Sequence, residues 1–495
     1  MAAPVESHRQ SPLCLPPELV TDIFSYLNTG EMLISLSVCK EWKNTLTRFV
    51  HGPLWRNLEV PNNSGRGWPG PSFEVVENML SWAGDGGANR IVMGRREMAR
   101  ETLTLLLNAS PNLEHLEYTL QEEDFLLPSN EHRWKRLKYV AIHESERAFL
   151  FNLPDVPGGF PRTFLQNAAS SLEHLALDGI PIHWHRLHSS GLEPKAPFLP
   201  KLKTLRMEES STTGLALPLF NLSDAFPGLE QLFLSQYAGT LFLGPMPSSR
   251  RREDVWPHLK VLLYEVYLEP ERHSRDISIL PFKYLTCPSR GNSLQHIRLD
   301  FGDPSWSCMF RDLRSQLPTS DVTQVSEFQS LRSFRSCGLP MSPVGARNLV
   351  SHAIQAGQLS SFDIVFPPTS PDHHESINHL QGYEWLRGAP SIVTLGCYHF
   401  SFPSYPKDNE DLCLPQFLAT FPNLQTLSIE SNAYRLPSFT HLMKEILKLT
   451  HLKTIYAYHY NDHARVRFLR QAAEERGVEL ITEERPQQWP MPLSS

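Results

Sequence analysis

The residues best suited to binding a metal ion are histidines in three short stretches. These are "HWHRLH" with His183, His185 and His188, "DHHESINH" from Asp372 to His379, and "HYNDH" with His459 and His463. A metal site needs ligands at a spacing that a regular element turns toward one point. The first two stretches combine no such spacing with a clear helix, and the third directly follows an expected strand. We therefore interpret these histidines as exposed loop residues and predict no metal and no cofactor.

The sequence also contains few motifs typical of a catalytic site. The stretch Gly84–Arg90 (GDGGANR) is rich in glycine but lacks the lysine of a phosphate-binding loop. Neither a G-x-S-x-G nucleophile turn nor a set of kinase motifs occurs. The seven cysteines are odd in number and include no C-x-x-C pair, which argues against a disulfide framework or a cysteine-rich zinc site. No motif therefore points to a catalytic site, and the cysteine usage predicts a reducing compartment, the cytoplasm, the nucleus or both.

Composition argues against two classes of partner. A net charge of −7 does not provide the basic surface that general nucleic-acid binding needs. No apolar run reaches the roughly 18 residues of a membrane-spanning helix. The N-terminus, MAAPVESHRQSP, lacks the basic and apolar regions of a secretory signal. We therefore expect neither a nucleic-acid nor a membrane partner.

A phrase of the form L-x-x-L-x-[apolar] recurs after the first fifty residues. Clear copies begin at Ser110, Ser170, Leu199, Phe226, Trp256, Asn292, Phe328, Ala389, Phe421 and Leu449. Weaker copies begin at Trp134 and Leu359, and "LWRNLEV" from Leu54 is expected to hold the first strand. The last apolar positions of each copy alternate, as in a half-buried strand. One strand per copy is therefore expected, with uneven intervals from the mid-twenties to the high thirties.

Helical patterns occupy several of these intervals. We expect helices over Gly345–Gln358, Phe439–Leu449 and Val466–Arg476, and a last strand over Val478–Ile481. Proline precedes the strand in many copies, which suits a loop-to-strand entry because proline cannot donate to a strand ladder. The pattern resembles leucine-rich repeats, in which each unit buries its leucines against its neighbours. The resemblance implies an α/β solenoid with a curved parallel sheet, and with helices and loops on its convex side.

The residues between the leucines should face away from the core, onto the concave side of such a sheet. Arginine and tyrosine are typical of binding hot spots, and arginine can hold a carboxylate or phosphate at two points. We hypothesise that this side binds an acidic or phosphorylated segment of a protein substrate, and the alternative is an ordinary solvated strand face. The predicted substrate-binding residues are Arg206, Phe233, Arg298, Arg335, Tyr398, Tyr456 and Tyr458.

The first fifty residues predict three short helices. In "LPPELVTDIFSYL" the prolines suit a helix start, and Leu19, Ile23, Phe24 and Leu27 form one apolar stripe. Asn28 and Glu31 have the spacing of a capping box for a second helix, and Ser37 could cap a third. So small a unit has too little core to be secure alone. Read without further comparison, it would be a helical cap for whatever follows.

The stretch "LPPELVTDIFSYLNTGEMLISLSVCKEWKNTL" resembles an F-box. The family pattern is Leu-Pro-x-Glu-Leu, an Ile-aromatic or Ile-Leu pair, Leu, a second apolar pair, and Val-Cys-basic-x-Trp. The resemblance covers about 8% of the chain, and Gly30-Glu31 departs from it in the turn between the helices. In the family this module docks on the Skp-type adaptor of an SCF ubiquitin ligase, and through it on a cullin. The implied adaptor-binding residues are Leu15, Pro16, Glu18, Leu19, Ile23, Phe24, Leu27, Leu33, Leu36, Val38 and Trp42.

The expected organisation is a disordered tail over residues 1–11, an F-box domain over 12–50, a leucine-rich-repeat solenoid over 51–485 and a disordered C-terminal tail over 486–495. The resemblance implies a substrate receptor for protein ubiquitination, which brings a target close to the ubiquitin carrier and performs no bond chemistry itself. One alternative is an F-box and leucine-rich-repeat scaffold that acts outside ubiquitin transfer. Another is an enzyme with a fused helical cap.

Overall fold

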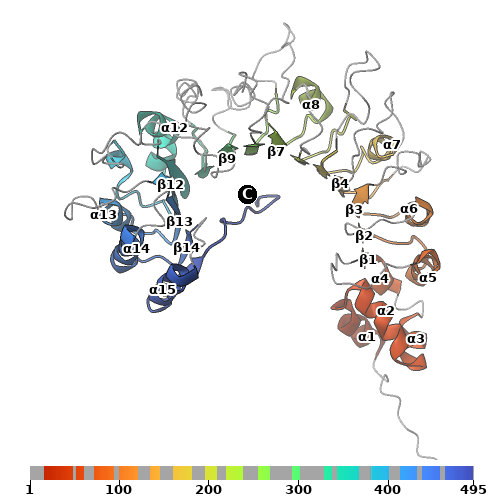
Figure 1. Cartoon of the computed structure of the whole chain (residues 1–495). Coiled ribbons are helices and arrows are strands. Elements are labelled where there is room, and N and C mark those ends of the chain that lie inside the picture. The colour runs from red at the N-terminus through yellow and green to blue at the C-terminus, as the bar shows by residue number, and fades with distance from the viewer. Residues whose placement is uncertain are drawn as a thin grey trace, which may run out of the picture. The chain divides into compact units, whose positions relative to one another are not determined.

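The computed structural model describes an α/β chain that divides into two compact units. The first comprises Met1–Thr213 with Asp224–Gly228, and the second comprises Gly214–Ser223 with Leu229–Ser495. The described residues are 16–47, 52–60, 72–93, 100–120, 134–144, 160–180, 196–208, 219–237, 255–267, 293–301, 328–336, 343–366, 380, 382–400, 413–431, 437–457 and 463–493. In both units, helices lie along one side of a run of strands (Figure 1).

The first unit begins with four short helices and continues with strands that pair in parallel in chain order. Its helices are α1 (Pro17–Ser25), α2 (Thr29–Val38), α3 (Lys40–Leu46), α4 (Gly52–Trp55), α5 (Phe73–Ala83), α6 (Arg100–Ala109) and α7 (Arg162–Asn167). Its strands are β1 (Asn57–Val60), β2 (Arg90–Met93), β3 (His115–Leu120), β4 (Tyr139–Glu144), β5 (His174–Asp178) and β6 (Thr204–Glu208). Helix α8 (Leu219–Ala225) spans the division between the units.

The second unit repeats the arrangement, again with parallel neighbours in chain order. Its strands are β7 (Gln231–Tyr237), β8 (Val261–Tyr267), β9 (His296–Phe301), β10 (Ser333–Arg335), β11 (Ser361–Val365), β12 (Thr394–Phe400), β13 (Thr426–Ser431), β14 (Thr454–Ala457) and β15 (Glu479–Ile481). Its helical segments are α12 (Pro343–Gln355), the 3₁₀ turn η7 (Glu384–Leu386), α13 (Cys413–Ala419), α14 (Pro437–Leu449) and α15 (His463–Glu474).

One recurring pattern of backbone hydrogen bonds links successive strands within each unit. At the entry to a strand, two consecutive N–H groups donate to a single carbonyl at the entry of the preceding strand. Glu114 and His115 both donate to Asn89, and Lys138 and Tyr139 both donate to Glu114. The same pairing recurs in the second unit, for example from Gln425 and Thr426 to Val393. Each strand entry thus supplies the carbonyl that accepts from the N–H groups at the entry of the next strand. A strand therefore forms only beside its neighbour, as expected of a repeat fold.

The prolines of the repeated phrase lie in tight turns just before the strands. Leu113 N–H donates to the carbonyl of Ser110 at 3.1 Å, and Leu259 N–H donates to that of Trp256 at 3.1 Å, so Pro111 and Pro257 each occupy the second turn position. Proline's fixed φ suits that position, and its missing N–H costs nothing there. The turn carries the chain from the helical side into the strand.

The leucines of the phrase form the core. Leu175, Leu205, Leu232 and Leu427 are at most 2% exposed, which confirms the predicted strand register. Strand starts lie between 24 residues apart (His115 to Tyr139) and 37 apart (His296 to Ser333), within the predicted range. Every predicted copy of the phrase holds a strand. The three helices predicted over Gly345–Gln358, Phe439–Leu449 and Val466–Arg476 are present as α12, α14 and α15.

Strand β2 was not predicted, because its phrase lacks the first leucine. Ala88 takes that position and is fully buried. The preceding Gly87 has a φ of +61°, and a Cβ there would overlap the carbonyl oxygen of Ala109. The glycine-rich stretch is therefore a tight turn against the end of α6.

The expectation of a disordered C-terminal tail from Pro486 is wrong. The chain leaves β15, crosses the strands of the second unit and ends beside β7 (Figure 1). Within the described part of the chain, no helix is both long and apolar enough to cross a membrane.

Candidate functional site

Local sequence accounts for the first two helices. Pro17 opens α1, where its missing N–H has no partner to lose, and Glu18 places negative charge in the first turn. The predicted capping box is present on α2: Glu31 N–H donates to Asn28 Oδ1 at 3.0 Å, and Asn28 N–H donates to Glu31 Oε2 at 2.9 Å. On α3 the cap is the sulfur of Cys39, which accepts from Trp42 N–H, rather than the predicted Ser37.

Helix α1 and the residue that ends it present three kinds of surface. Val20 and Phe24 are buried, and Phe24 packs edge-on against Trp42 with ring centroids 5.4 Å apart. Asp22 and Ser25 form a polar exposed side. A third side is apolar and exposed, with Leu19 at 48%, Ile23 at 50% and Tyr26 at 82% exposure.

Helix α2 also carries exposed apolar side chains at helical spacing. Ile34 is 68% exposed and Val38 is 60% exposed, four residues apart on one side of the helix. Large apolar side chains that gather on an exposed surface mark an interaction site. The helices thus offer an apolar surface to a partner.

A comparison with protein families bears on these helices. Residues 12–51 match the family model described as the F-box domain. The chain carries an F-box domain. F-box domains in general bind Skp-type adaptors of SCF-type ligases. A comparison with curated protein sequences returns no match.

The structure distributes the predicted adaptor-binding residues of the F-box domain over surface and core. Exposed are Pro16, Glu18, Leu19, Ile23 and Val38; half-buried are Leu27, Leu33, Leu36 and Trp42; Phe24 is buried; and Leu15 lies outside the described residues. The pattern reading missed Tyr26 and Ile34, although their helical spacing from Ile23 and Val38 could have revealed them.

The F-box domain is joined tightly to the first strand. Trp55 in α4 is fully buried, and its Nε1–H donates to the carbonyl of Leu46 at 2.8 Å. Thr29 Oγ1, at the start of α2, accepts from Glu59 N–H at 2.8 Å. The strand expected in "LWRNLEV" is present as β1, directly after α4.

A second candidate site lies on the strand face opposite the leucine core, here called the inner face. Across strands β7–β14, parallel register aligns one residue from each strand in a row on this face. The row starts with apolar residues, continues with charged residues and ends with small or aromatic ones. Its members are Phe233, Leu263, Arg298, Arg335, Asp363, Gly396, Ser428 and Tyr456.

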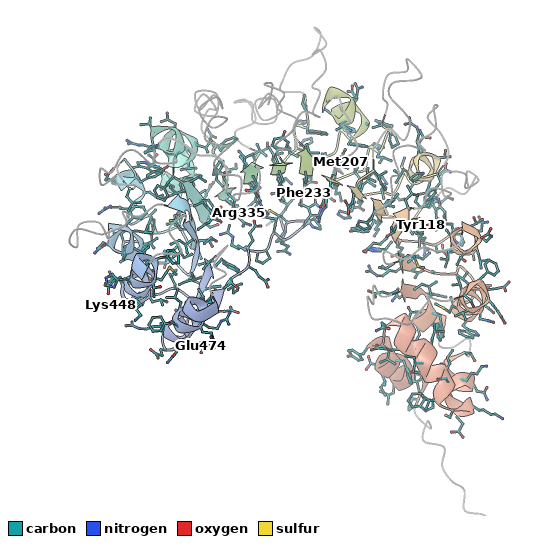
Figure 2. The ribbon with its side chains drawn as sticks, in the orientation of Figure 1. Tyr118, Met207, Phe233, Arg335, Lys448 and Glu474 are labelled. Carbon is teal, nitrogen blue, oxygen red and sulfur yellow. The ribbon has the colours of Figure 1, made fainter. Side chains whose placement is uncertain are left out.

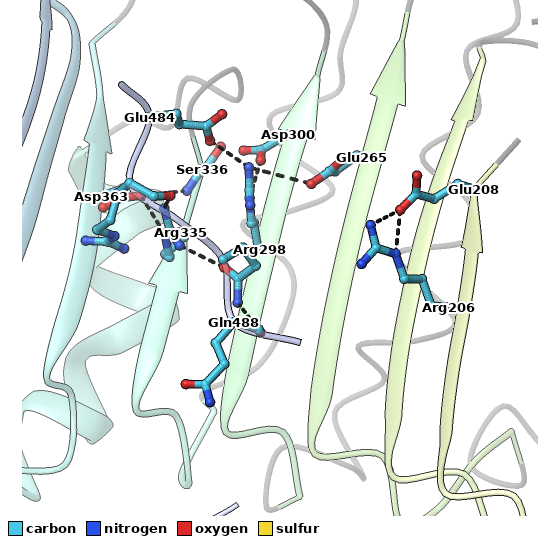
Figure 3. Close-up of polar contacts among 12 residues, drawn as sticks. Arg206, Glu208, Glu265, Arg298, Asp300, Arg335, Ser336, Asp363, Glu484 and Gln488 are labelled. Atoms are coloured by element: carbon cyan, nitrogen blue, oxygen red, sulfur yellow. Dashed lines mark hydrogen bonds and ion pairs between the residues drawn. The ribbon is translucent and has the colours of Figure 1, made fainter. Parts of the chain in front are cut away.

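Arg298 lies at the centre of a charge cluster on this face (Figure 3). It pairs with Asp300 on its own strand, with Glu265 of β8 at 3.5 Å and with Glu484 of the C-terminal segment at 2.7 Å. Burial alone would lower the pKa of Arg298, but these three carboxylates raise it. The guanidinium therefore stays charged although it is only 8% exposed.

Asp363 forms the next part of the cluster. Its Oδ2 accepts from Ser336 N–H at 3.2 Å and lies 3.9 Å from Arg335 Nε. Complete burial raises the pKa of Asp363, and Arg485 and Arg335 oppose the rise. A side chain at Gly396 would overlap the Asp363 carboxylate and the ring of Tyr398, so glycine leaves the space that this carboxylate occupies.

The C-terminal residues 482–493, here called the strap, lie on the inner face of the second unit. Arg335 Nη1 donates to Gln487 Oε1 at 2.7 Å, and Arg335 Nη2 donates to the carbonyl of Arg485 at 3.3 Å. Gln231 Nε2 donates to the carbonyl of Met491 at 2.9 Å, and Met491 N–H donates to Gln231 Oε1 at 2.9 Å.

The apolar side chains at the end of the strap pack on the apolar residues at the start of the row. Trp489 packs on Phe233 with ring centroids 5.8 Å apart, and Met491 and Leu493 join it against Phe233, Val261 and Leu263. Along the strap, burial alternates: residues 485, 487, 489, 491 and 493 are half-buried, and the residues between them are exposed. The strap is thus an extended chain with one side toward the sheet.

The predicted substrate-binding residues do not form one open surface. Figure 2 shows Phe233 and Arg335 on the side of the strands that the strap crosses. Phe233, Arg298 and Arg335 are 6–9% exposed, so their expected exposure is wrong in this structure. Arg206 belongs to the first unit and pairs with Glu208. Tyr398 is buried, Tyr456 is half-buried, and Tyr458 lies outside the described residues.

Sequence reasoning missed the residues that complete this face: Gln231, Asp363, Glu484, Arg485, Gln487, Trp489 and Met491. The usable signal was the alternation of Arg485, Gln487, Trp489, Met491 and Leu493, which have the two-residue period of an extended chain. The histidines of "HWHRLH" and "DHHESINH", together with the His463 side chain and His459, lie outside what the structure describes.

Proposed function

We propose that this protein is the substrate receptor of an SCF-type ubiquitin ligase. The observation that carries the proposal is the F-box match over residues 12–51, together with the exposed apolar side chains on α1 and α2. The F-box domain would dock on a Skp-type adaptor and through it on a cullin, in the cytoplasm, the nucleus or both. The strand units, which we assign to the leucine-rich-repeat class, would bind the protein target.

The mechanism follows from proximity. A receptor that holds both the adaptor and a target raises the effective concentration of target lysines near the charged ubiquitin carrier. The receptor supplies binding surfaces and no reacting group. The buried attachment of α4 and the Thr29 contact to β1 give the F-box domain a fixed connection to the strands that follow it.

The test of adaptor binding uses the exposed apolar side of α1. Leu19→Ala with Ile23→Ala should weaken co-purification of a Skp-type adaptor by at least about tenfold, because apolar anchors carry most of the energy of an interface. Asp22→Ala with Ser25→Ala, on the polar exposed side of the same helix, is the matched control and should bind normally. Equal adaptor recovery with both variants would refute the docking surface.

The alternative function is an F-box scaffold that acts outside ubiquitin transfer. Measuring the turnover of the bound target distinguishes the two functions. A ligase target should accumulate when the proteasome is blocked or when the α1 variant replaces the wild type. A scaffold partner should be captured equally under all of these conditions and should carry no added ubiquitin.

A further inference from the structure

The inner face of the second unit has features of a binding site rather than of a protein core. Arg298, Arg335 and Asp363 point away from the leucines, toward a side that solvent would reach without the strap. Burying charges is costly, and a core seldom retains them unless they serve another purpose. The strap contacts Arg298 and Arg335 directly and so contributes to their burial.

The strap fits this face imperfectly. Among the described residues, Arg335 Nε, Asp363 Oδ1 and Arg485 Nη1 are buried without a hydrogen-bond partner. These three atoms lie in the same charged part of the interface. A buried polar atom without a partner weakens the contact that buries it. A different occupant with partners for Arg335 Nε and Asp363 Oδ1 would bind better than the strap does.

The strap also lacks the features of a permanent sheet element. It has no regular secondary structure, and Pro486, Pro490 and Pro492 interrupt its backbone donors. Its described backbone contacts to the sheet run through the side chains of Gln231 and Arg335. One side of the strap remains exposed along its length. It can therefore leave without breaking a strand ladder.

We propose that the strap is a resident ligand of a peptide-binding site on β7–β11, and that a segment of a target protein binds there by displacing it. The strap shows what the site accepts: an extended segment with an acid next to a base, followed by large apolar side chains at every second residue. Identifying the displacing segment as part of a ubiquitination target rests on the proposed function; the site itself does not.

Charge on the inner face favours such a mixed segment. Arg298 and Arg335 face three carboxylates of the sheet, namely Glu265, Asp300 and Asp363. The strap then adds one group of each sign, Glu484 toward Arg298 and Arg485 near Asp363. A segment with acidic or phosphorylated residues alone would leave the buried Asp363 without a cation from its ligand.

The test uses the full chain and a fluorescent peptide with the sequence of residues 482–493. In a released variant, Glu484→Ala, Trp489→Ala and Met491→Ala remove the side chains that contact Arg298 and the apolar cluster. In a matched control, Glu483→Ala, Gln488→Ala and Pro492→Ala alter three exposed strap positions. Fluorescence anisotropy reports peptide binding, and no adaptor is present.

The released variant should bind the peptide at least about tenfold more tightly than the wild type or the control. The tethered strap competes at an effective concentration of roughly millimolar, and only the released variant loses that competition. A peptide with alanine in place of Trp489 should not bind. Equal binding by all three proteins, or no binding by the released variant, would overturn the proposal.

If the released variant is less stable than the wild type, a second measurement tests the proposal on the wild-type chain. Excess peptide added to the wild-type chain should speed hydrogen exchange at the strap's own amides, because the two compete for one site. Unchanged exchange at millimolar peptide would overturn the proposal. A failure here leaves adaptor binding through the F-box domain untouched, whereas a failure of the α1 variants to lose the adaptor leaves the peptide site standing.

Discussion

The ionisation of His296 should couple to the stability of the fold. This residue lies on the inner face of β9, where burial, and to a lesser extent Arg332, lower its pKa from 6.5 to about 4. The folded chain therefore holds this histidine neutral, while the unfolded chain takes up a proton as pH falls below 6.5. The contribution of His296 to the free energy of unfolding should be present at neutral pH and decline between pH 6.5 and about 4.

Denaturant unfolding at several pH values checks this prediction. Acidification should destabilise the wild type more than it destabilises His296→Gln, which cannot take up the proton. The raised pKa of Asp363 acts in the opposite direction at low pH. Only the difference between the two chains therefore isolates His296. Parallel stability profiles for both chains would contradict the assignment.

The sequence predicted which residues are buried in the leucine core. It predicted the exposure of residues on the opposite face less well. The phrase placed Leu205 and Leu427 inside because their period sets one side of a strand. The same period places Thr204 and Ser428 on the opposite face, where they are only 4% and 3% exposed. Thr204 Oγ1 lies 2.8 Å from His174 Nδ1 on the neighbouring strand. Strand period fixes which side a residue occupies, and it cannot tell how well neighbouring side chains cover that side.

Elements were predictable where their own residues carry the signal. Thirteen strands follow from copies of the leucine phrase, and the last strand and six helices follow from other local patterns. Strand β2 has Ala88 in place of the first leucine. The strap is different in kind, because its position depends on side chains such as Gln231 and Arg335 that lie far from it in the sequence. Its place at the C-terminus predicted disorder, and only its contacts with the distant inner face show order.

Gly87 tests the turn that leads into β2. Gly87→Ala should destabilise the first unit through two effects, a φ of +61° that favours glycine and an overlap with the carbonyl of Ala109. Gly357 has a similar φ of +65° and no heavy atom within 4 Å of an added Cβ. Gly357→Ala should therefore cost about 1 kcal/mol from backbone conformation alone, and Gly87→Ala clearly more. Equal costs in thermal or denaturant unfolding would show that the turn can relax.

At the scale of the whole molecule, the two proposed sites have separate tasks. The F-box helices would hold the adaptor, and the inner face of the second unit would hold the target once the strap has left. Because the strap belongs to the same chain, it would lower target affinity without altering the adaptor surface. Target capture and adaptor capture should thus respond to different substitutions.

Combining the variants in cells tests this separation. The released variant should capture more target than wild type and shorten the target's half-life, because the strap no longer competes for the site. Adding Leu19→Ala and Ile23→Ala to the released variant should keep target capture high but lengthen the target's half-life, since the ligase is no longer recruited. Pull-downs of adaptor and target, with pulse-chase of the target, give all of these quantities. A target whose half-life ignores both sets of substitutions, although it binds the released chain, would favour the scaffold function over ubiquitin transfer.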